Sequence, residues 1–244
     1  MMRNLKLAFL VSLTFPLSLA AQQPRDSLLP PHRTSVHWYH AVAAFGVFGA
    51  ATLLDRTVRD ETQQHRSAGK DDVAKAFRHM GQPEVYAVVG FGTIAAGLLA
   101  GDTRITRSGE RITAGLLLAG TTSSLLKAVV GRRRPNGGSG PYEIRFFSGQ
   151  YGWPSGHTTM AFALATGVSD ELHSTPATVA LYGAATMTAW SRVNDNRHWL
   201  SDVLAGAVVG VTSAKLMNGH WRVFGITGPR FLIGPGTVGV NLRF

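Results

Sequence analysis

HWLSDVLAG, at residues 198–206, opens the last apolar segment of the chain, which continues to Met217. If this segment is a helix, His198 and Asp202 are four residues apart and share one face of it. A carboxylate in that position can hold one imidazole nitrogen as N–H and leave the lone pair of the other nitrogen free. An imidazole oriented in this way is a candidate nucleophile. Taken alone, the pair fits equally well a histidine that is simply satisfied within a core.

Six apolar segments of the chain fit helices, and together they predict an all-α fold. They cover residues 38–54, 85–101, 112–130, 158–169, 177–190 and 202–217. Between the first two, Val73, Ala76, Phe77 and Met80 recur at helical spacing, which indicates an amphipathic helix. The prediction is a helical bundle of about six core helices, which occupies residues 37–218.

The two ends of the chain have a different character. Residues 1–21 combine a positive start, an apolar centre and a small-residue cleavage site, which is typical of an export signal. An uncleaved first membrane helix is the alternative. Residues 22–36 form a polar linker broken by prolines. In residues 219–244, apolar and polar residues alternate up to Phe244, which predicts a short C-terminal β-hairpin.

Two further polar clusters lie at the ends of apolar segments. Lys127-x6-Arg134-Pro135 follows one segment, and Pro154-Ser155-Gly156-His157 precedes the next. Ser191-Arg192 stands shortly before His198 and completes the third cluster. Together the clusters supply three cations, two histidines and one carboxylate, which suits the binding of a phosphate and attack on its phosphorus.

This order of motifs resembles the type-2 phosphatidic acid phosphatase and vanadium haloperoxidase superfamily. The resemblance covers about residues 85–217, and each specified motif residue is present. It implies the helical fold of that superfamily and a metal-independent phosphoric ester hydrolase. The phrases around the second and third clusters are most similar to the membrane lipid-phosphatase branch. Arg132 and Arg133 fall on unspecified positions of the pattern, so we interpret them as surface charges.

The expected roles follow from chemistry and from the resemblance. His198 is the nucleophile that forms a phosphohistidine, and Asp202 orients it. His157 is the general acid for the leaving oxygen and then the base for water. The phosphate-binding residues are Lys127, Arg134, Ser155, Gly156 and Arg192, through cationic side chains, a hydroxyl and the N–H groups of a helix start.

We expect no metal and no other cofactor, because the cations of the motifs neutralise the phosphate and the remaining histidines lack metal spacing. The chain has no cysteine and a net charge of +10. Nucleic acid is not an expected partner, since no basic stripe interleaves with aromatic residues. An anionic membrane surface and an anionic substrate remain as explanations of the charge. The sequence leaves the oligomeric state open.

Whether the helices cross a membrane is open at this stage, because seventeen helical residues span about 26 Å against a hydrocarbon core of about 30 Å. We expect an exported, membrane-associated protein of the bacterial cell envelope with a periplasm-facing site. If three early segments span after an exported N-terminus, however, the Lys127 cluster would face the cytoplasm. Either one early segment does not span, therefore, or the bundle is a soluble periplasmic domain.

The expected function is hydrolysis of a phosphomonoester or diphosphate carried by a lipid or isoprenoid. The alternatives are a soluble periplasmic acid phosphatase, a vanadate haloperoxidase and a non-catalytic envelope protein. Phosphatidate, undecaprenyl diphosphate, a lipid A phosphate and small soluble esters all fit the sequence as substrates.

Overall fold

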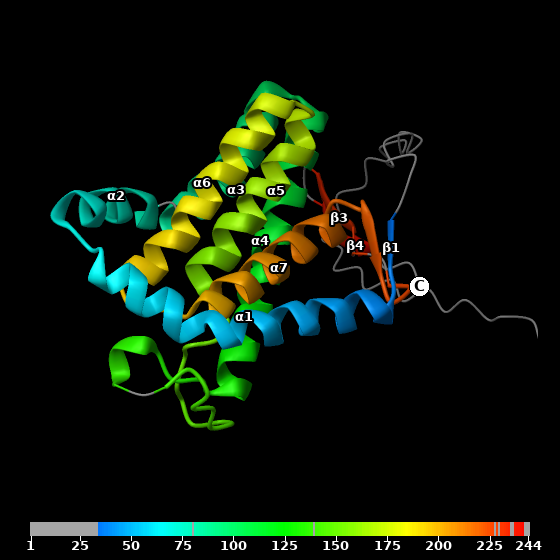
Figure 1. Ribbon diagram of the computed structural model, residues 1–244. Coiled ribbons are helices and arrows are strands. Elements are labelled where there is room, and N and C mark those ends of the chain that lie inside the picture. The colour runs from blue at the N-terminus through cyan, green and yellow to red at the C-terminus, as the bar shows by residue number, and fades with distance from the viewer. Residues whose placement is uncertain are drawn as a thin grey trace, which may run out of the picture.

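The computed structural model describes residues 34–79, 81–138, 140–226, 228, 230–234 and 237–241 (Figure 1). Its α-helices are α1 (Trp38–Gln64), α2 (Ala68–His79), α3 (Pro83–Ala100), α4 (Thr103–Val130), α5 (Gly156–Leu172), α6 (Thr175–Asn194) and α7 (Leu200–Met217). A 3-10 turn, η1 (Pro135–Gly137), follows α4. The strands are β1 (Thr34–Val36), β2 (Trp221–Val223), β3 (Arg230–Gly234) and β4 (Thr237–Asn241). The predicted helical bundle is confirmed.

The predicted C-terminal hairpin is also present, because β3 and β4 pair in antiparallel register. The last three residues of the predicted linker, 34–36, form β1, which pairs in parallel with β2. Local sequence could not reveal this pairing, since the two strands are far apart along the chain. The predicted export signal and the first part of the linker lie outside the described residues.

Two helices are longer than their apolar segments. α1 continues past residue 54 to Gln64, and α4 begins at Thr103 instead of residue 112. The start of α4 is set by Asp102, whose carboxylate accepts hydrogen bonds from the backbone N–H groups of Arg104 and Ile105 at 2.8 and 3.2 Å. Such a cap satisfies N–H groups that have no partner within the helix. The apolar pattern of the sequence shows which part of a helix is buried in protein or lipid, whereas the capping residue shows where the helix begins.

Helix α5 lies inside the bundle, in contact with α4, α6 and α7. Two glycines on α7 permit a close approach to α5. A Cβ at Gly206 would lie 2.7 Å from the carbonyl oxygen of Ser155, and one at Gly210 would lie 2.3 Å from that of Thr159. A side chain at either position would push the two helices apart. This packing brings the start of α5 beside the start of α7.

Helix α1 runs antiparallel to α7. Just before α1, Thr34 of β1 is paired with Trp221, which lies just after α7. Further along α1, Asp55 contacts Ser201 in the first turn of α7. Residues 34–36 and the start of α7 therefore lie at opposite ends of this helix pair, and α1 and α7 run alongside each other in Figure 1.

The surface of the bundle suits a lipid environment. Helices α1, α4 and α7, and the run Ala68–Ala100 that contains α3, are long and apolar enough to cross a membrane. Large apolar side chains are exposed on these helices, for example Phe45, Leu53, Phe91 and Leu99. Exposure on this scale is unusual for a protein surrounded by water and is expected where lipid tails cover the surface. The fold is therefore that of a membrane protein.

Candidate active site

The three polar clusters meet at one end of the bundle. Neighbouring helices of the bundle run antiparallel, so the end of one helix lies beside the start of the next. Lys127 is in the last turn of α4 and Arg192 in the last turn of α6, while His157 and Asp202 are in the first turns of α5 and α7. The ammonium of Lys127 donates a hydrogen bond to the carbonyl of Pro154, which joins the first cluster to the second.

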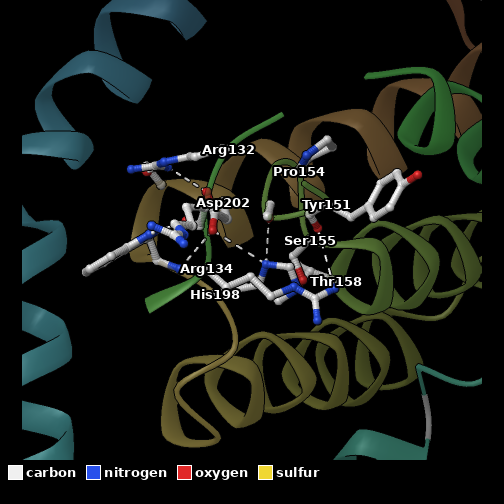
Figure 2. A network of polar contacts seen from close by, with 12 residues as sticks. Arg132, Arg134, Tyr151, Pro154, Ser155, Thr158, His198 and Asp202 are labelled. Atoms are coloured by element: carbon white, nitrogen blue, oxygen red, sulfur yellow. Dashed lines mark hydrogen bonds and ion pairs between the residues drawn. The ribbon is translucent and has the colours of Figure 1, made fainter. Parts of the chain in front are cut away.

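The imidazole of His198 has two acceptors, which lie at different distances from its Nδ1. Its Nδ1 lies 2.8 Å from the carbonyl oxygen of Gly152 and 3.5 Å from Oδ2 of Asp202. A carbonyl oxygen can only accept, so Nδ1 carries the proton and Nε2 presents the lone pair. Asp202 is the expected orienter of the ring, and the structure adds Gly152 as a second and nearer partner. Asp202 lies within electrostatic reach of the imidazole (Figure 2).

Gly152 has no room for a side chain. A Cβ there would lie 2.4 Å from the carbonyl oxygen of Arg132. The N–H of Gly152 donates to that same carbonyl at 2.8 Å, which helps to hold in place the residue whose own carbonyl accepts from His198. The sequence reasoning missed this glycine, although its place in the loop before the second cluster was visible.

Arg132 is not a surface charge, and the interpretation made from sequence is wrong. Its side chain is buried, with 1% of the residue exposed. The guanidinium donates to Oδ1 of Asp202 at 2.5 Å and to Oδ2 of Asp55 at 2.6 Å. Gly131 ends α4 with φ of +58°, and this left-handed turn redirects the chain so that Arg132 enters the protein. Figure 2 shows Asp202 between Arg132 and His198.

Asp55 was also missed by sequence reasoning. It is fully buried and accepts hydrogen bonds from the N–H and hydroxyl of Ser201 at 2.8 and 2.6 Å. The available signal was its position directly after the apolar segment 38–54, where a carboxylate is costly unless it is paired.

Both histidines of the site are uncharged at neutral pH in this state. Burial lowers the pKa of His157 to about 4, with the positive charges of Arg192 and Lys127 adding repulsion. Burial likewise lowers the pKa of His198 to about 4, against the opposing effect of Asp202. His157 also packs against the turn before α3, since a Cβ at Gly81 would lie 2.8 Å from the Cβ of His157. The site thus contains two neutral imidazoles among several cations.

Arg192 lies close enough to His157 to lower the pKa of that imidazole. Its Nη1 donates to Oδ2 of Asp195 at 2.8 Å, and Arg78 of α2 binds the same carboxylate at 3.0 Å. Within the described part of the chain, the buried Nε of Arg192 has no hydrogen-bond partner. Burial lowers its pKa to about 10, so the guanidinium still carries its charge at neutral pH. A buried donor without an acceptor is a position where a bound anion would be stabilised.

Ser155 is positioned differently from the expectation. Its backbone N–H donates to the carbonyl of Asp202 at 2.9 Å, so it is not available to a phosphate. Its hydroxyl accepts from Oγ1 of Thr158 at 2.9 Å, which leaves the hydroxyl hydrogen to be donated. Gly156 and His157 begin α5, and the N–H groups of the first helical turn have no acceptor within the helix.

Arg134 and the loop of residues 136–153, which carries several aromatic side chains, lie at the edge of the site. Nη2 of Arg134 is 3.5 Å from the carbonyl oxygen of Tyr151, and the residue is partly exposed. In the loop, Tyr142, Phe146 and Phe147 are 62%, 67% and 77% exposed, so they are not packed down onto the protein. Each predicted site residue thus lies at this end of the bundle, and the arrangement can bind an anion beside an imidazole lone pair.

The chain is similar in sequence to known proteins. The model of the PAP2 superfamily matches residues 111–223. A lipid A 1-phosphatase of Porphyromonas gingivalis is 33% identical over 182 residues, which are 70% of this chain and 36% of that protein. The chain therefore spans about a third of the length of this curated relative.

Two solved structures share the fold. The crystal structure of Aquifex aeolicus LpxE has a TM-score of 0.54 at 19% identity, and the match covers 67% of this chain and 94% of that one. The first transmembrane PAP2 type phosphatidylglycerolphosphate phosphatase of Bacillus subtilis has a TM-score of 0.51 at 20% identity, and the match covers 74% and 95%.

Proposed function

Residues 111–223 match the model of the PAP2 superfamily, and from this premise we propose that the chain is a phosphatase of that superfamily acting on a phosphorylated lipid. One observation carries the proposal above the others: two neutral histidines and three cations gather at one end of an apolar bundle. His198 presents the lone pair of Nε2, and Arg192 presents a buried Nε without a partner among the described residues. A phosphate group supplies both the electrophile and the missing acceptor.

In the proposed reaction, Nε2 of His198 attacks phosphorus, and the bond from phosphorus to the lipid oxygen breaks. His157 gives a proton to the leaving oxygen, so the lipid departs as an alcohol. His157 then takes a proton from water, which attacks phosphorus and releases inorganic phosphate with His198 regenerated. Because the pKa of His157 is about 4 in the empty site, the negative charge of the substrate must raise it before it can act as an acid.

We assign the phosphate oxygens to donors from each cluster. Arg192 donates through Nε, Ser155 through its hydroxyl, and Gly156 through the N–H at the start of α5. Lys127 and Arg134 contribute positive charge, since both act electrostatically on His198. Such donors are effective because they are already in place before charge develops in the transition state.

The apolar surroundings support a lipid as the carrier of the phosphate. The exposed aromatic residues of the loop, Tyr142, Phe146 and Phe147, lie beside the site and are positioned to contact acyl chains. The relative from Porphyromonas gingivalis is named a lipid A 1-phosphatase, so a lipid A phosphate is the first substrate to test. We place the site on the periplasmic face of the membrane.

The test is release of inorganic phosphate by detergent-purified protein. The panel comprises lipid A 1-phosphate, phosphatidate, undecaprenyl diphosphate, phosphatidylglycerol phosphate and the soluble ester p-nitrophenyl phosphate. We expect turnover of at least one lipid to exceed that of the soluble ester, and we expect His198→Ala to remove it. Equal or faster turnover of the soluble ester would contradict a lipid substrate, and absence of release from the entire panel would contradict the phosphatase itself.

A further inference from the structure

In the described part of the chain, the most heavily buried charges lie behind His198, outside the phosphate site. Among the described residues, Asp55, Arg132 and Asp202 are each at most 1% exposed, and they join three segments of the chain. One guanidinium stands between two carboxylates, so the three side chains carry a net charge of −1. Burying such a group is costly unless its geometry is well satisfied.

The geometry is satisfied in detail. Besides the carboxylates, the guanidinium donates to the carbonyl of Pro141 at 2.8 and 2.6 Å and to Oγ of Ser201 at 2.7 Å. Its carbon lies 6.0 Å from the ring centre of Trp199. The two oxygens of the Asp202 carboxylate have different partners. Oδ1 binds Arg132, while Oδ2 accepts from the N–H of Trp199 and faces Nδ1 of His198 at 3.5 Å.

The role of Asp55 follows from counting these charges. If Arg132 paired with Asp202 alone, the pair would be neutral, and little negative field would reach the imidazole. Because Asp55 pairs with the same guanidinium, the single positive charge of Arg132 is divided between two carboxylates. A net negative charge therefore remains at Asp202, next to His198. We infer that Asp55 is a positioning residue, which maintains the charge of Asp202 through Arg132 and thereby supports the positive charge that His198 acquires on phosphorylation. This inference rests on the proposed function of His198.

Other charges face His198 as well, and none of them replaces Asp55. Lys127 and Arg134 repel a positive imidazole, and the pKa of His198 responds to both. His157 is uncharged in the empty site. The negative field at His198 therefore comes from the carboxylates behind it. The strength of this field depends on how far the positive charge of Arg132 neutralises Asp202 and how far it neutralises Asp55.

The test uses variants that change the charge of this group in opposite directions. Asp55→Asn makes the net charge 0, Arg132→Gln makes it −2, and the double variant restores −1. Asp55→Asn should lower kcat by about 10- to 100-fold, as loss of an outer hydrogen-bond partner commonly does, with KM within about twofold. The double variant should recover at least part of kcat relative to Asp55→Asn. Asp60→Asn, on the same helix but 43% exposed, is the matched control and should behave as the parent.

A second measurement does not depend on activity. The pKa of His198, followed by NMR of 15N-labelled imidazoles and assigned with His198→Gln, should fall in Asp55→Asn and return toward the parent value in the double variant. If Arg132→Gln folds, its His198 pKa should rise. The inference would be overturned if the double variant had the same low kcat and the same low His198 pKa as Asp55→Asn. It would also be overturned if Asp55→Asn had the kcat of the parent protein.

If the parent protein were inactive but the His198 pKa values followed the expected order, the proposed function would be rejected, whereas the electrostatic coupling of Asp55 to His198 would be supported.

Discussion

Nδ1 of His198 lies 2.8 Å from the carbonyl oxygen of Gly152, which is nearer than the 3.5 Å to the carboxylate of Asp202. The tautomer of the imidazole is therefore fixed by a backbone group that cannot titrate. Asp202 is left with an electrostatic role, since its own oxygens bind Arg132 and the N–H of Trp199. Orientation and charge stabilisation, which one carboxylate performs in many catalytic triads, are divided here between two groups.

The first prediction concerns the nucleophile. His198→Ala should reduce kcat by at least about 10⁴-fold, as loss of a covalent nucleophile does. The parent enzyme, quenched during turnover of a radiolabelled lipid phosphate, should carry acid-labile and alkali-stable label on His198. Asp202→Asn should be less damaging than His198→Ala, because Gly152 still sets the tautomer. Label on a serine, or a labelled His198→Ala protein, would refute the assignment.

The second prediction concerns the arginine side chains. Arg192→Lys and Arg134→Lys keep the charge but lose the planar fork, so kcat/KM should fall by on the order of 10²–10³-fold. Arg133→Lys is the matched control, because the side chain of Arg133 is 43% exposed and pairs with Glu143 at 3.2 Å, and it should cost little. Similar losses in Arg133→Lys and Arg134→Lys would show that the phosphate donors have been assigned to the wrong arginine.

The third prediction concerns vanadate and metals. Vanadate should inhibit competitively, since its trigonal-bipyramidal form resembles the phosphoryl transition state. The Arg192→Lys variant should be inhibited less, because the Nε donor is lost. Activity should persist in EDTA, since cationic side chains perform the neutralisation. Activity lost in EDTA and restored by a divalent cation would contradict this, and halide oxidation by the vanadate-loaded protein would favour a haloperoxidase.

The fourth prediction concerns stability at acid pH. An unfolded histidine has a pKa of about 6.5, and the pKa values of His157 and His198 are about 4 in the folded protein. Between these values the unfolded chain binds protons that the folded chain does not, so stability falls as pH decreases from about 6.5 to 4. For His198 the loss at pH 5 is on the order of 2 kcal/mol.

Thermal unfolding in detergent at pH 7 and pH 5 measures this loss. The decrease in Tm between the two pH values should be smaller in His198→Gln than in the parent protein. His65→Gln, at an exposed histidine just after α1, is the control and should match the parent. A parental decrease in His198→Gln would mean that His198 is not buried in its neutral form.

The fifth prediction concerns membrane topology, and the absence of cysteine makes it directly measurable. Ser35 lies before the start of α1, whereas Ser148 lies beside the site, at the opposite end of the pair formed by α1 and α7. If α1 crosses the membrane, Ser35→Cys and Ser148→Cys should react with an impermeant thiol reagent from opposite sides. We expect Ser148, in the exposed loop beside the site, to be labelled from the periplasm.

Labelling of both cysteines from one side would mean that α1 does not cross. This result matters for the N-terminus. A periplasm-facing site and a spanning α1 place residues 34–36 in the cytoplasm, which conflicts with an exported N-terminus. An exported N-terminus is compatible with a periplasm-facing site only if an early helix does not span the bilayer.

The sequence alone determined the helical class, the hairpin and the residues of the three clusters. Helix-forming segments and the alternating strand pattern are local properties, so periodicity records them directly. The residues of the phosphate site could also be proposed from local properties, namely their type, their spacing and the order of the three clusters along the chain. Helix ends were less accurate, because caps such as Asp102 fall outside the apolar segments.

Only the tertiary structure decided which charges are buried and which partners they have. Arg132 and Arg133 are adjacent and look alike in sequence, yet Arg132 is enclosed by two carboxylates while Arg133 lies near the surface. The difference arises because Gly131 turns the chain inward and because α1, distant in sequence, brings Asp55 to the same point. Ion pairs between separate segments depend on how helices pack, and packing is a property of the whole chain that no local pattern contains.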